Sequence, residues 1–215
     1  KQDSIRKVPR KGMQVVLIKR EDYPYMDKWA LPGGFVDIEE SLEESAKRKL
    51  KEKTGIDKVY FEQLYTFGDV YRDKRTRVIS VGNIALVEKN SIELIEADSN
   101  KKSQWFWIDK TLISNAINER YIEKKHLLSL KSTDEKIMIN YEVTEKVEKD
   151  LLRRKETSYR LLENSTEELA FDHYKIIDYG IDRLRNKIEY TPIAFNLLSE
   201  VFTVNATSQL RVFES

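Results

Sequence analysis

The chain has 215 residues, of which 40% are apolar and 35% are charged, and its formal net charge is +1. This length suits one large or two small domains, and the balanced charge gives no overall sign of affinity for nucleic acid. Because cysteine is absent, disulfides and thiol chemistry are excluded. No stretch approaches the roughly 20 apolar residues of a membrane span. No signal peptide is visible either, so we expect a cytoplasmic protein.

The N-terminal part of the chain predicts a strand, a loop and a helix in that order. The apolar run 13–19, MQVVLIK, is typical of a strand, and residues 29–34, WALPGG, form a loop after it. A helix is expected after Glu40, because Ser41 and Glu44 have the spacing of a capping box.

Segment 33–56 joins this glycine-rich loop to the helix and ends on a glycine and an apolar residue. Its spacing resembles the Nudix box, and the matching positions are Gly34, Glu40, Arg48, Leu50, Glu52, Gly55 and Ile56. Nudix proteins present the same order of strand, Trp-x-Leu-Pro-Gly-Gly loop and helix. At two positions where the family carries glutamate, this chain carries Lys49 and Lys53.

Positions 49, 52 and 53 share one helix face, because they lie three and four residues apart. In a Nudix hydrolase they would be three carboxylates that bind Mg²⁺, which clamps a pyrophosphate and helps to activate water. Lysine carries only donors and cannot ligate a metal, so Glu52 is left as the candidate catalytic and metal-binding residue. The lysines could instead attract the phosphate of a ligand, or the face could be a solvated surface.

Residues 59–67 and 77–87 predict two strands joined by a polar loop, 68–76. Arginines in and beside this loop could bind a diphosphate with their forked guanidinium groups, although a solvated hairpin tip is the alternative. Residues 103–108 predict a further strand, and residues 112–121 predict a helix. The candidate ligand-binding residues are Gly33, Gly34, Glu40, Arg48, Lys49, Lys53, Arg72 and Arg77.

The stretch 116–168 contains no glycine or proline and is rich in charges of both signs. Within it, residues 136–143 alternate like a strand, and residues 151–162 have helical spacing. We interpret the stretch as an ordered insertion. It could pack against a partner subunit or brace the next domain.

The last section predicts an amphipathic helix from five apolar residues at helical spacing, Ile176, Ile177, Ile181, Leu184 and Ile188. Pro192 follows, and proline disfavours helix at the residue before it. The phrases at 169–173, 191–198 and 202–203 resemble a branch of Nudix-related transcriptional regulators, in which a Nudix-like domain is joined to a winged helix. His173 belongs to the first phrase, and we expect it to make a structural hydrogen bond.

The resemblance implies an α/β (α+β) fold, a mixed-sheet α/β/α sandwich followed by a partial winged-helix domain. It divides the chain into a Nudix-like ligand-binding domain (1–115), a charged insertion (116–168) and the start of a C-terminal winged-helix domain (169–215). It also implies a homodimer that binds DNA through the complete C-terminal domain. Because the chain starts at Lys1 and stops within a helical-looking pattern, we expect more sequence beyond Ser215.

Three functions fit these observations. The first is a transcriptional regulator whose Nudix-like domain senses an ADP-ribose-type nucleotide or a sugar without turnover and needs no cofactor. The alternative is a Mg²⁺-dependent hydrolase of ADP-ribose or a related nucleoside diphosphate, with Glu40, Glu52 and a third acid such as Glu43, Glu44 or Asp69 holding the metal. A binding module without DNA or catalysis, with the insertion as its interface, is the third.

Overall fold

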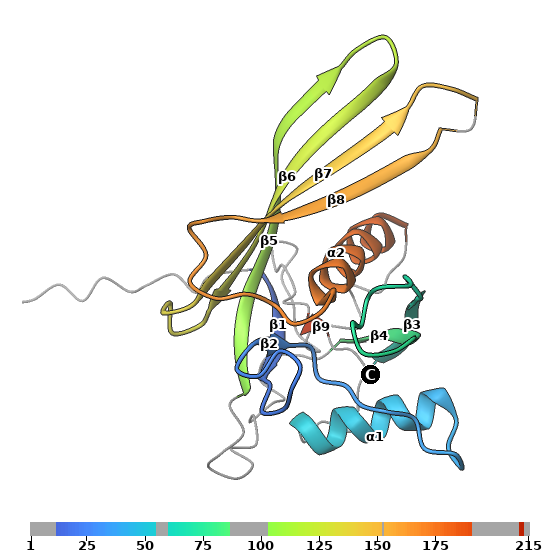
Figure 1. Ribbon diagram of the computed structural model, residues 1–215, viewed down its shortest axis with the longest axis vertical. Helices are drawn as coiled ribbons and strands as arrows, with labels where there is room; N and C mark the ends of the chain where they lie inside the picture. The colour runs from blue at the N-terminus through green and yellow to red at the C-terminus, as the bar shows by residue number, and fades with distance from the viewer. Residues whose placement is uncertain (1–11, 55–59, 87–102, 152, 191–210, 213–215) are drawn as a thin grey trace, which may run out of the picture.

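The computed structural model describes residues 12–54, 60–86, 103–151, 153–190 and 211–212. They form a mixed sheet of order β2-β1-β5-β6-β7-β8 with β9 parallel to β1, a β3–β4 hairpin and two helices (Figure 1). No helix among these residues is long and apolar enough to cross a membrane. The elements are β1 (Met13–Lys19), β2 (Trp29–Ala30), α1 (Leu42–Thr54), β3 (Tyr60–Phe67), β4 (Ser80–Leu86), β5 (Ser103–Ile117), β6 (Tyr121–Ser132), β7 (Met138–Glu148), β8 (Lys155–Leu161), α2 (His173–Tyr190) and β9 (Arg211–Val212).

The strand predicted at 13–19 is confirmed as β1, which lies in the middle of the core. Val15, Val16 and Leu17 are fully buried, which explains why this strand is continuously apolar instead of alternating. It pairs antiparallel with β5, whose Phe106 is also fully buried. Helix α2 packs against the face formed by these two strands.

Helix α2 presents its apolar stripe to the sheet, which confirms the helix predicted in the last section. Ile176, Ile177, Ile181 and Leu184 are at most 1% exposed and belong to the same hydrophobic cluster as Val15 and Phe106. The section that begins at residue 169 therefore contributes a helix to the same hydrophobic core as the N-terminal strands. Most of the segment predicted to begin a winged-helix domain, 191–210, lies outside the described residues.

Helix α1 lies at the far side of the molecule from the outer ends of β5–β8 (Figure 1). It buries a narrow face through Ala46 and Leu50, and most of its other side chains are exposed. The predicted capping box is confirmed, because the Glu44 amide donates to Ser41 Oγ at 3.2 Å and the Ser41 amide donates to Glu44 Oε2 at 2.9 Å. Gly55, the expected C-terminal cap, lies outside the described residues.

The outer halves of the hairpins β5–β6 and β7–β8 extend from the body as an arm beyond α2 (Figure 1). All four strands are joined in one antiparallel register, so that Ile117 pairs with Ile122 and Ile122 with Val147. Residue 116, where the insertion was expected to begin, lies within β5. Most of the stretch 116–168 thus continues the central sheet.

Two of the predicted helices are wrong. Residues 112–117 belong to β5 and residue 121 begins β6, while β8 occupies residues 155–161. The apolar residues Leu112, Ile113, Ala116 and Ile117 imitate a helical stripe, yet three of them are more than half exposed. Hydrogen bonding to neighbouring strands, a tertiary effect, decides the conformation of both segments. The mixed sheet with its two helices confirms the predicted fold class.

Candidate functional site

The glycine loop and α1 meet where Lys49 crosses Gly34. A Cβ atom on Gly34 would lie 2.6 Å from Lys49 Cε, so the lysine side chain lies directly over this glycine and would have to shift for any larger residue. The Lys49 side chain is 21% exposed, and its ammonium lies 3.2 Å from Glu52 Oε2. The two residues therefore share a helix face, as their spacing predicted.

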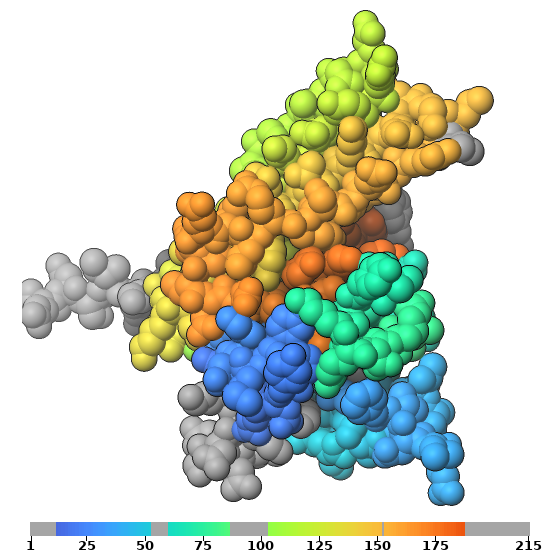
Figure 2. Space-filling model, in the orientation of Figure 1, coloured from blue at the N-terminus to red at the C-terminus, as the bar shows by residue number. Residues whose placement is uncertain are grey.

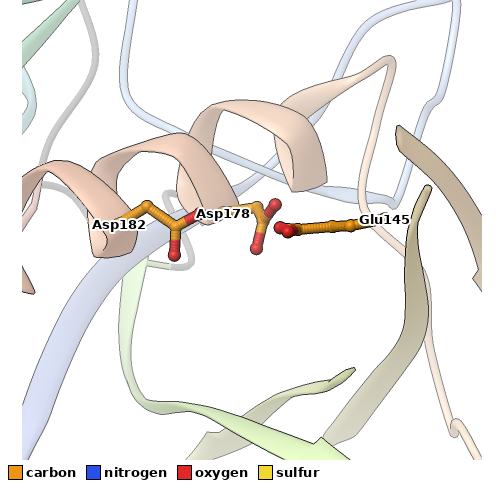
Figure 3. Close-up of side chains that lie close together, drawn as sticks. All are labelled: Glu145, Asp178 and Asp182. Atoms are coloured by element: carbon orange, nitrogen blue, oxygen red, sulfur yellow. The ribbon is translucent and has the colours of Figure 1, made fainter. Parts of the chain in front are cut away.

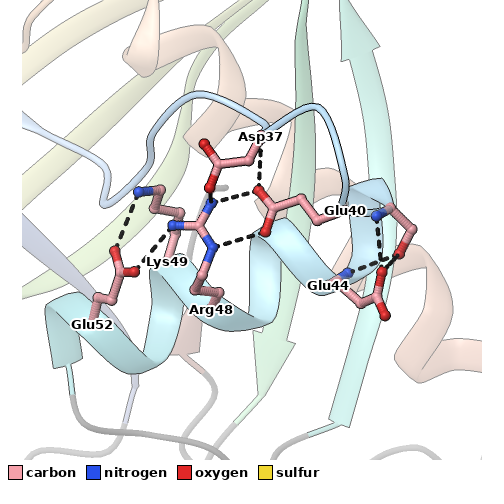
Figure 4. Close-up of polar contacts among 7 residues, drawn as sticks. Asp37, Glu40, Glu44, Arg48, Lys49 and Glu52 are labelled. Atoms are coloured by element: carbon pink, nitrogen blue, oxygen red, sulfur yellow. Dashed lines mark hydrogen bonds and ion pairs between the residues drawn. The ribbon is translucent and has the colours of Figure 1, made fainter.

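Arg48 pairs with three acidic residues of the box segment, Asp37, Glu40 and Glu52 (Figure 4). Its guanidinium lies 2.8 Å from Glu40 Oε2, 2.8 Å from Asp37 Oδ2 and 3.0 Å from Glu52 Oε1. The Arg48 hydrogen bond, with a second from the Asp37 amide, lowers the pKa of Glu40 to about 2. Hydrogen bonds from Arg48 and Lys49 likewise lower the pKa of Glu52.

Both box glutamates, Glu40 and Glu52, are thus ionised and already paired with cations of α1. A Mg²⁺ ion would have to compete with Arg48 for Glu40, and with Arg48 and Lys49 for Glu52. Within the described part of the chain, the box brings no three metal-type side chains within reach of one another. The side chain of Lys53 lies outside that part. The residues present do not make a ready Mg²⁺ site.

The third acids considered for a hydrolase are also engaged. Glu43 pairs with Lys47 at 2.5 Å, and Glu44 caps α1 through Ser41. Asp69 lies 2.5 Å from the ammonium of Lys175 on α2. Each carboxylate therefore has a structural partner outside a metal site.

The two arginines predicted to bind ligand, Arg72 and Arg77, have different surroundings. The Arg72 side chain is only 5% exposed and makes a two-point ion pair with Asp172, at 3.0 and 2.8 Å, so its guanidinium joins the loop to the segment before α2. Arg77 is exposed and donates to the carbonyl groups of Gly68 and Asp69 at 2.7 and 3.0 Å. Neither arginine joins the charged group of Asp37, Glu40, Arg48, Lys49 and Glu52, which we call the box cluster. Both support the loop instead.

His173 makes the structural hydrogen bond expected of it. Its Nδ1 atom accepts a hydrogen bond of 2.9 Å from the Leu31 amide, next to the glycine loop. Loss of solvation lowers the pKa of His173 to about 4, so the ring is neutral at pH 7. The neutral ring can accept this bond, and α2 thereby fixes the start of the loop.

A second charged cluster joins α2 to the arm (Figure 3), and sequence reasoning missed it. The Lys110 ammonium lies 2.7 Å from Asp178, 2.9 Å from Asp182 and 3.4 Å from Glu145. Ligand-type atoms of these three acids lie within 4.8 Å of one another, an arrangement that could hold a metal ion. Here Lys110, whose side chain is 2% exposed, supplies the positive charge. We call this set the Lys110 cluster.

The Lys110 cluster is held by burial and charge together. Burial raises the pKa of Asp178, and Tyr159 donates a hydrogen bond of 2.9 Å to its second oxygen. Burial alone would lower the pKa of Lys110, but the charges of Asp178 and Asp182 outweigh it and raise that pKa. Lys110 follows the buried Phe106 and Ile108 at alternating positions of β5, and this signal could have revealed an inward lysine.

Comparison with known proteins gives the same picture as the fold. The ADPR responsive transcriptional repressor NtrR of Acinetobacter baylyi is 28% identical over 194 residues, which is 89% of this chain and 56% of that protein. The ADP-ribose pyrophosphatase of Methanocaldococcus jannaschii is 34% identical over 96 residues, 45% of this chain and 56% of that protein. The chain thus spans little more than half the length of these relatives.

Two solved structures are similar over most of the chain. A MutT/nudix family protein from Enterococcus faecalis has a TM-score of 0.59 and 26% identity, and the match covers 91% of this chain and 71% of that one. Shewanella oneidensis NrtR, complexed with a 27mer DNA, has a TM-score of 0.54 and 26% identity, with 89% and 70% covered. The NUDIX domain family matches residues 5–129, more than half of the chain, and the chain therefore belongs to this family.

Proposed function

We propose that the chain is the ligand-sensing part of a transcriptional regulator, which binds an ADP-ribose-type nucleotide or a sugar without hydrolysing it. The observation that carries the proposal is the pairing of both box glutamates with Arg48 and Lys49. A Nudix reaction needs a metal that clamps the pyrophosphate and helps to activate water. Here protein cations occupy the carboxylates that would hold it, so the reaction loses its metal while a binding surface remains.

The binding surface would be the glycine loop with the exposed side of α1. Gly33 and Gly34 leave the backbone accessible, and Lys49 brings an ammonium group against Gly34. Phe35, which is 80% exposed, follows directly and could stack on the base of a nucleotide. Arg48, Glu40 and Lys53 complete the proposed set, and Arg77 supports the neighbouring loop. Arg72 does not contact the ligand in this proposal. It supports the neighbouring loop through its ion pair with Asp172.

The comparisons support the regulator. The similarity to an ADPR responsive repressor extends over 89% of the chain, whereas the similarity to an ADP-ribose pyrophosphatase extends over 45%. A structure that matches most of the chain contains DNA. A homodimer that binds DNA through a complete C-terminal domain follows as part of the proposal, and a cytoplasmic location follows because the DNA is there. An effector acts by binding one conformation of such a protein more tightly than another.

The second candidate is a Mg²⁺-dependent hydrolase of ADP-ribose or a related nucleoside diphosphate. The observation in its favour is the 34% identity to an ADP-ribose pyrophosphatase. It requires Glu40 and Glu52 to leave Arg48, and a third acid to leave its present partner. Mg²⁺ enters as a cofactor only in this alternative.

Calorimetry with ADP-ribose tests the proposal. We expect binding in the presence of EDTA with the same affinity as in Mg²⁺, because the site supplies its own cations. Lys49→Ala should weaken binding about tenfold, the effect of losing one charge-assisted hydrogen bond. Lys47→Ala is the matched control, since Lys47 lies on the same helix and pairs with Glu43 on its outer side. Binding that appears only with Mg²⁺ would contradict the proposal.

A further inference from the structure

The outer half of β5 has a free edge in the described part of the chain. Strand β1 pairs with β5 only from Ser103 to Ile108, whereas β6 pairs with β5 as far as Ile117. From residue 109 to residue 117 one side of β5 therefore has no strand partner among the described residues. Such an edge presents backbone donors and acceptors that can pair with another strand.

The composition of this edge does not discourage pairing. Residues 111–118, TLISNAIN, contain no charged residue, although 35% of the chain is charged. Leu112, Ile113 and Ile117 are 51%, 54% and 65% exposed. A bulge leaves Ile113 without a Cα partner on β6, so this side chain belongs to no pair of the ladder. The segment is apolar, exposed and open to a strand partner.

The opposite edge of the same arm differs. Strand β8 is the last strand of the sheet and carries Lys155, Glu156 and Arg160 within seven residues. Charged side chains on an edge strand are the usual protection against pairing with another chain. Of the two edges of the arm, one is protected by charges and the other is not. The space-filling view shows the arm standing clear of the body, where a second molecule can reach it (Figure 2).

We propose that the outer half of β5 pairs with the same segment of a second copy of this chain. Antiparallel pairing about a two-fold axis places identical segments together, and this segment brings no like charges into contact. An unrelated partner would be selected by complementary charges, which the segment lacks. The two arms then form one continuous sheet, and Leu112, Ile113 and Ile117 become buried. This inference rests on the proposed homodimer and names its surface.

Sedimentation equilibrium of the 215-residue chain tests the inference. We expect a dimer whose dissociation constant rises at least about 100-fold in Ile113→Lys, because a charge would be desolvated at the axis. Far-ultraviolet circular dichroism should stay unchanged. Leu151→Lys is the matched control and should remain dimeric, since Leu151 is fully exposed at the β7–β8 turn, away from this edge. A dimer that persists in Ile113→Lys would overturn the inference.

A mixing experiment identifies the molecule that pairs with the outer half of β5. Ile113→Lys and Ile113→Glu should each be monomeric alone and should form a mixed dimer when combined, because the opposite charges then meet across the axis. No mixed dimer, or a native chain that stays monomeric because its own residues 1–11 cover the edge, would overturn the inference. ADP-ribose affinity measured in the same variants keeps the two proposals apart. A lost dimer with unchanged ADP-ribose binding supports both, whereas a persistent dimer with the expected binding defeats only this one.

Discussion

The box cluster around Arg48 and the Lys110 cluster both hold carboxylates with protein cations, but they differ in burial. Glu52 is 46% exposed, while the side chains of Lys110 and Asp178 are 2% and 5% exposed. Exposed ion pairs are screened by water and cost little to exchange, whereas a buried charge that loses its partner is costly. The exposed ion pairs of the box cluster can therefore be exchanged for contacts with a ligand. The buried ion pairs of the Lys110 cluster instead hold α2 against the arm.

Removal of the buried cation should have the largest effect. Lys110→Met leaves Asp178 and Glu145 without their shared ammonium, and we expect a loss of about 3–5 kcal/mol in the free energy of unfolding. Urea denaturation at pH 7 measures it. Lys155→Met is the control, because Lys155 pairs with Glu145 from the half-exposed side. Equal losses in the two variants would show that burial does not separate the clusters.

The Lys110→Met variant also sharpens the comparison with a metal site. Without the ammonium, the carboxylates of Glu145, Asp178 and Asp182 keep a spacing that a divalent cation can bridge. We expect Ca²⁺ to raise the melting temperature of this variant and to leave the native chain unaffected. An equal shift in both proteins would mean that the cation binds elsewhere.

His173 predicts a pH dependence from a second buried group. Its folded-state pKa of about 4 lies below the ordinary value of 6.5, so the unfolded chain takes up the proton first. The contribution of His173 to stability is complete above pH 6.5 and is lost as the pH drops towards 4, by up to about 3 kcal/mol. In His173→Gln, the free energy of unfolding, measured by denaturation at several pH values, should depend less on pH across this range. His126→Gln serves as the comparison, since the pKa of His126 is also lowered by burial.

A change in the exposed cluster should alter binding and not stability. Lys49→Glu with Lys53→Glu restores the acidic pattern of the box, and we expect calorimetry to show Mg²⁺ binding that the native chain lacks. Lys47→Glu with Lys51→Glu makes the same change in charge on other positions of α1. Mg²⁺ heats of equal size in both double variants would indicate nonspecific attraction and contradict the role given to positions 49 and 53.

The smallest expected effect is that of Arg48→Gln on folding. Its partners Glu40 and Glu52 can be solvated when the guanidinium is removed, so the melting temperature should change little. The affinity for ADP-ribose is the quantity expected to fall. A large loss of thermal stability would place the box cluster with the buried structural groups.

Local patterns predicted the elements whose signals are local. The capping box at Ser41, the apolar run at 13–19 and the stripe that includes Ile177 each agree with the structure. The helix predicted at residues 112–121 was wrong, because the apolar spacing of residues 112–117 fits a helix and only pairing with β6 shows the strand. The insertion likewise shows its place in the central sheet only through long-range pairing.

The candidate site divides in the same way. The contact of Lys49 with Glu52 follows from helical spacing, and it was predictable. The ion pair of Arg72 with Asp172 joins residues 100 positions apart, and no local pattern predicts its burial. The Lys110 cluster also requires the packing of α2 against the sheet. Local patterns could not predict the partners of charges that are paired with residues distant in the sequence.

Release of AMP from ADP-ribose in Mg²⁺, measured at high protein concentration beside an active Nudix hydrolase, shows whether the paired carboxylates of the box can still support hydrolysis. We expect no release by the folded chain, since Arg48 and Lys49 occupy the carboxylates that a metal would need. Clear release that Glu52→Gln abolishes would contradict this expectation and show that the two lysines leave the hydrolase active.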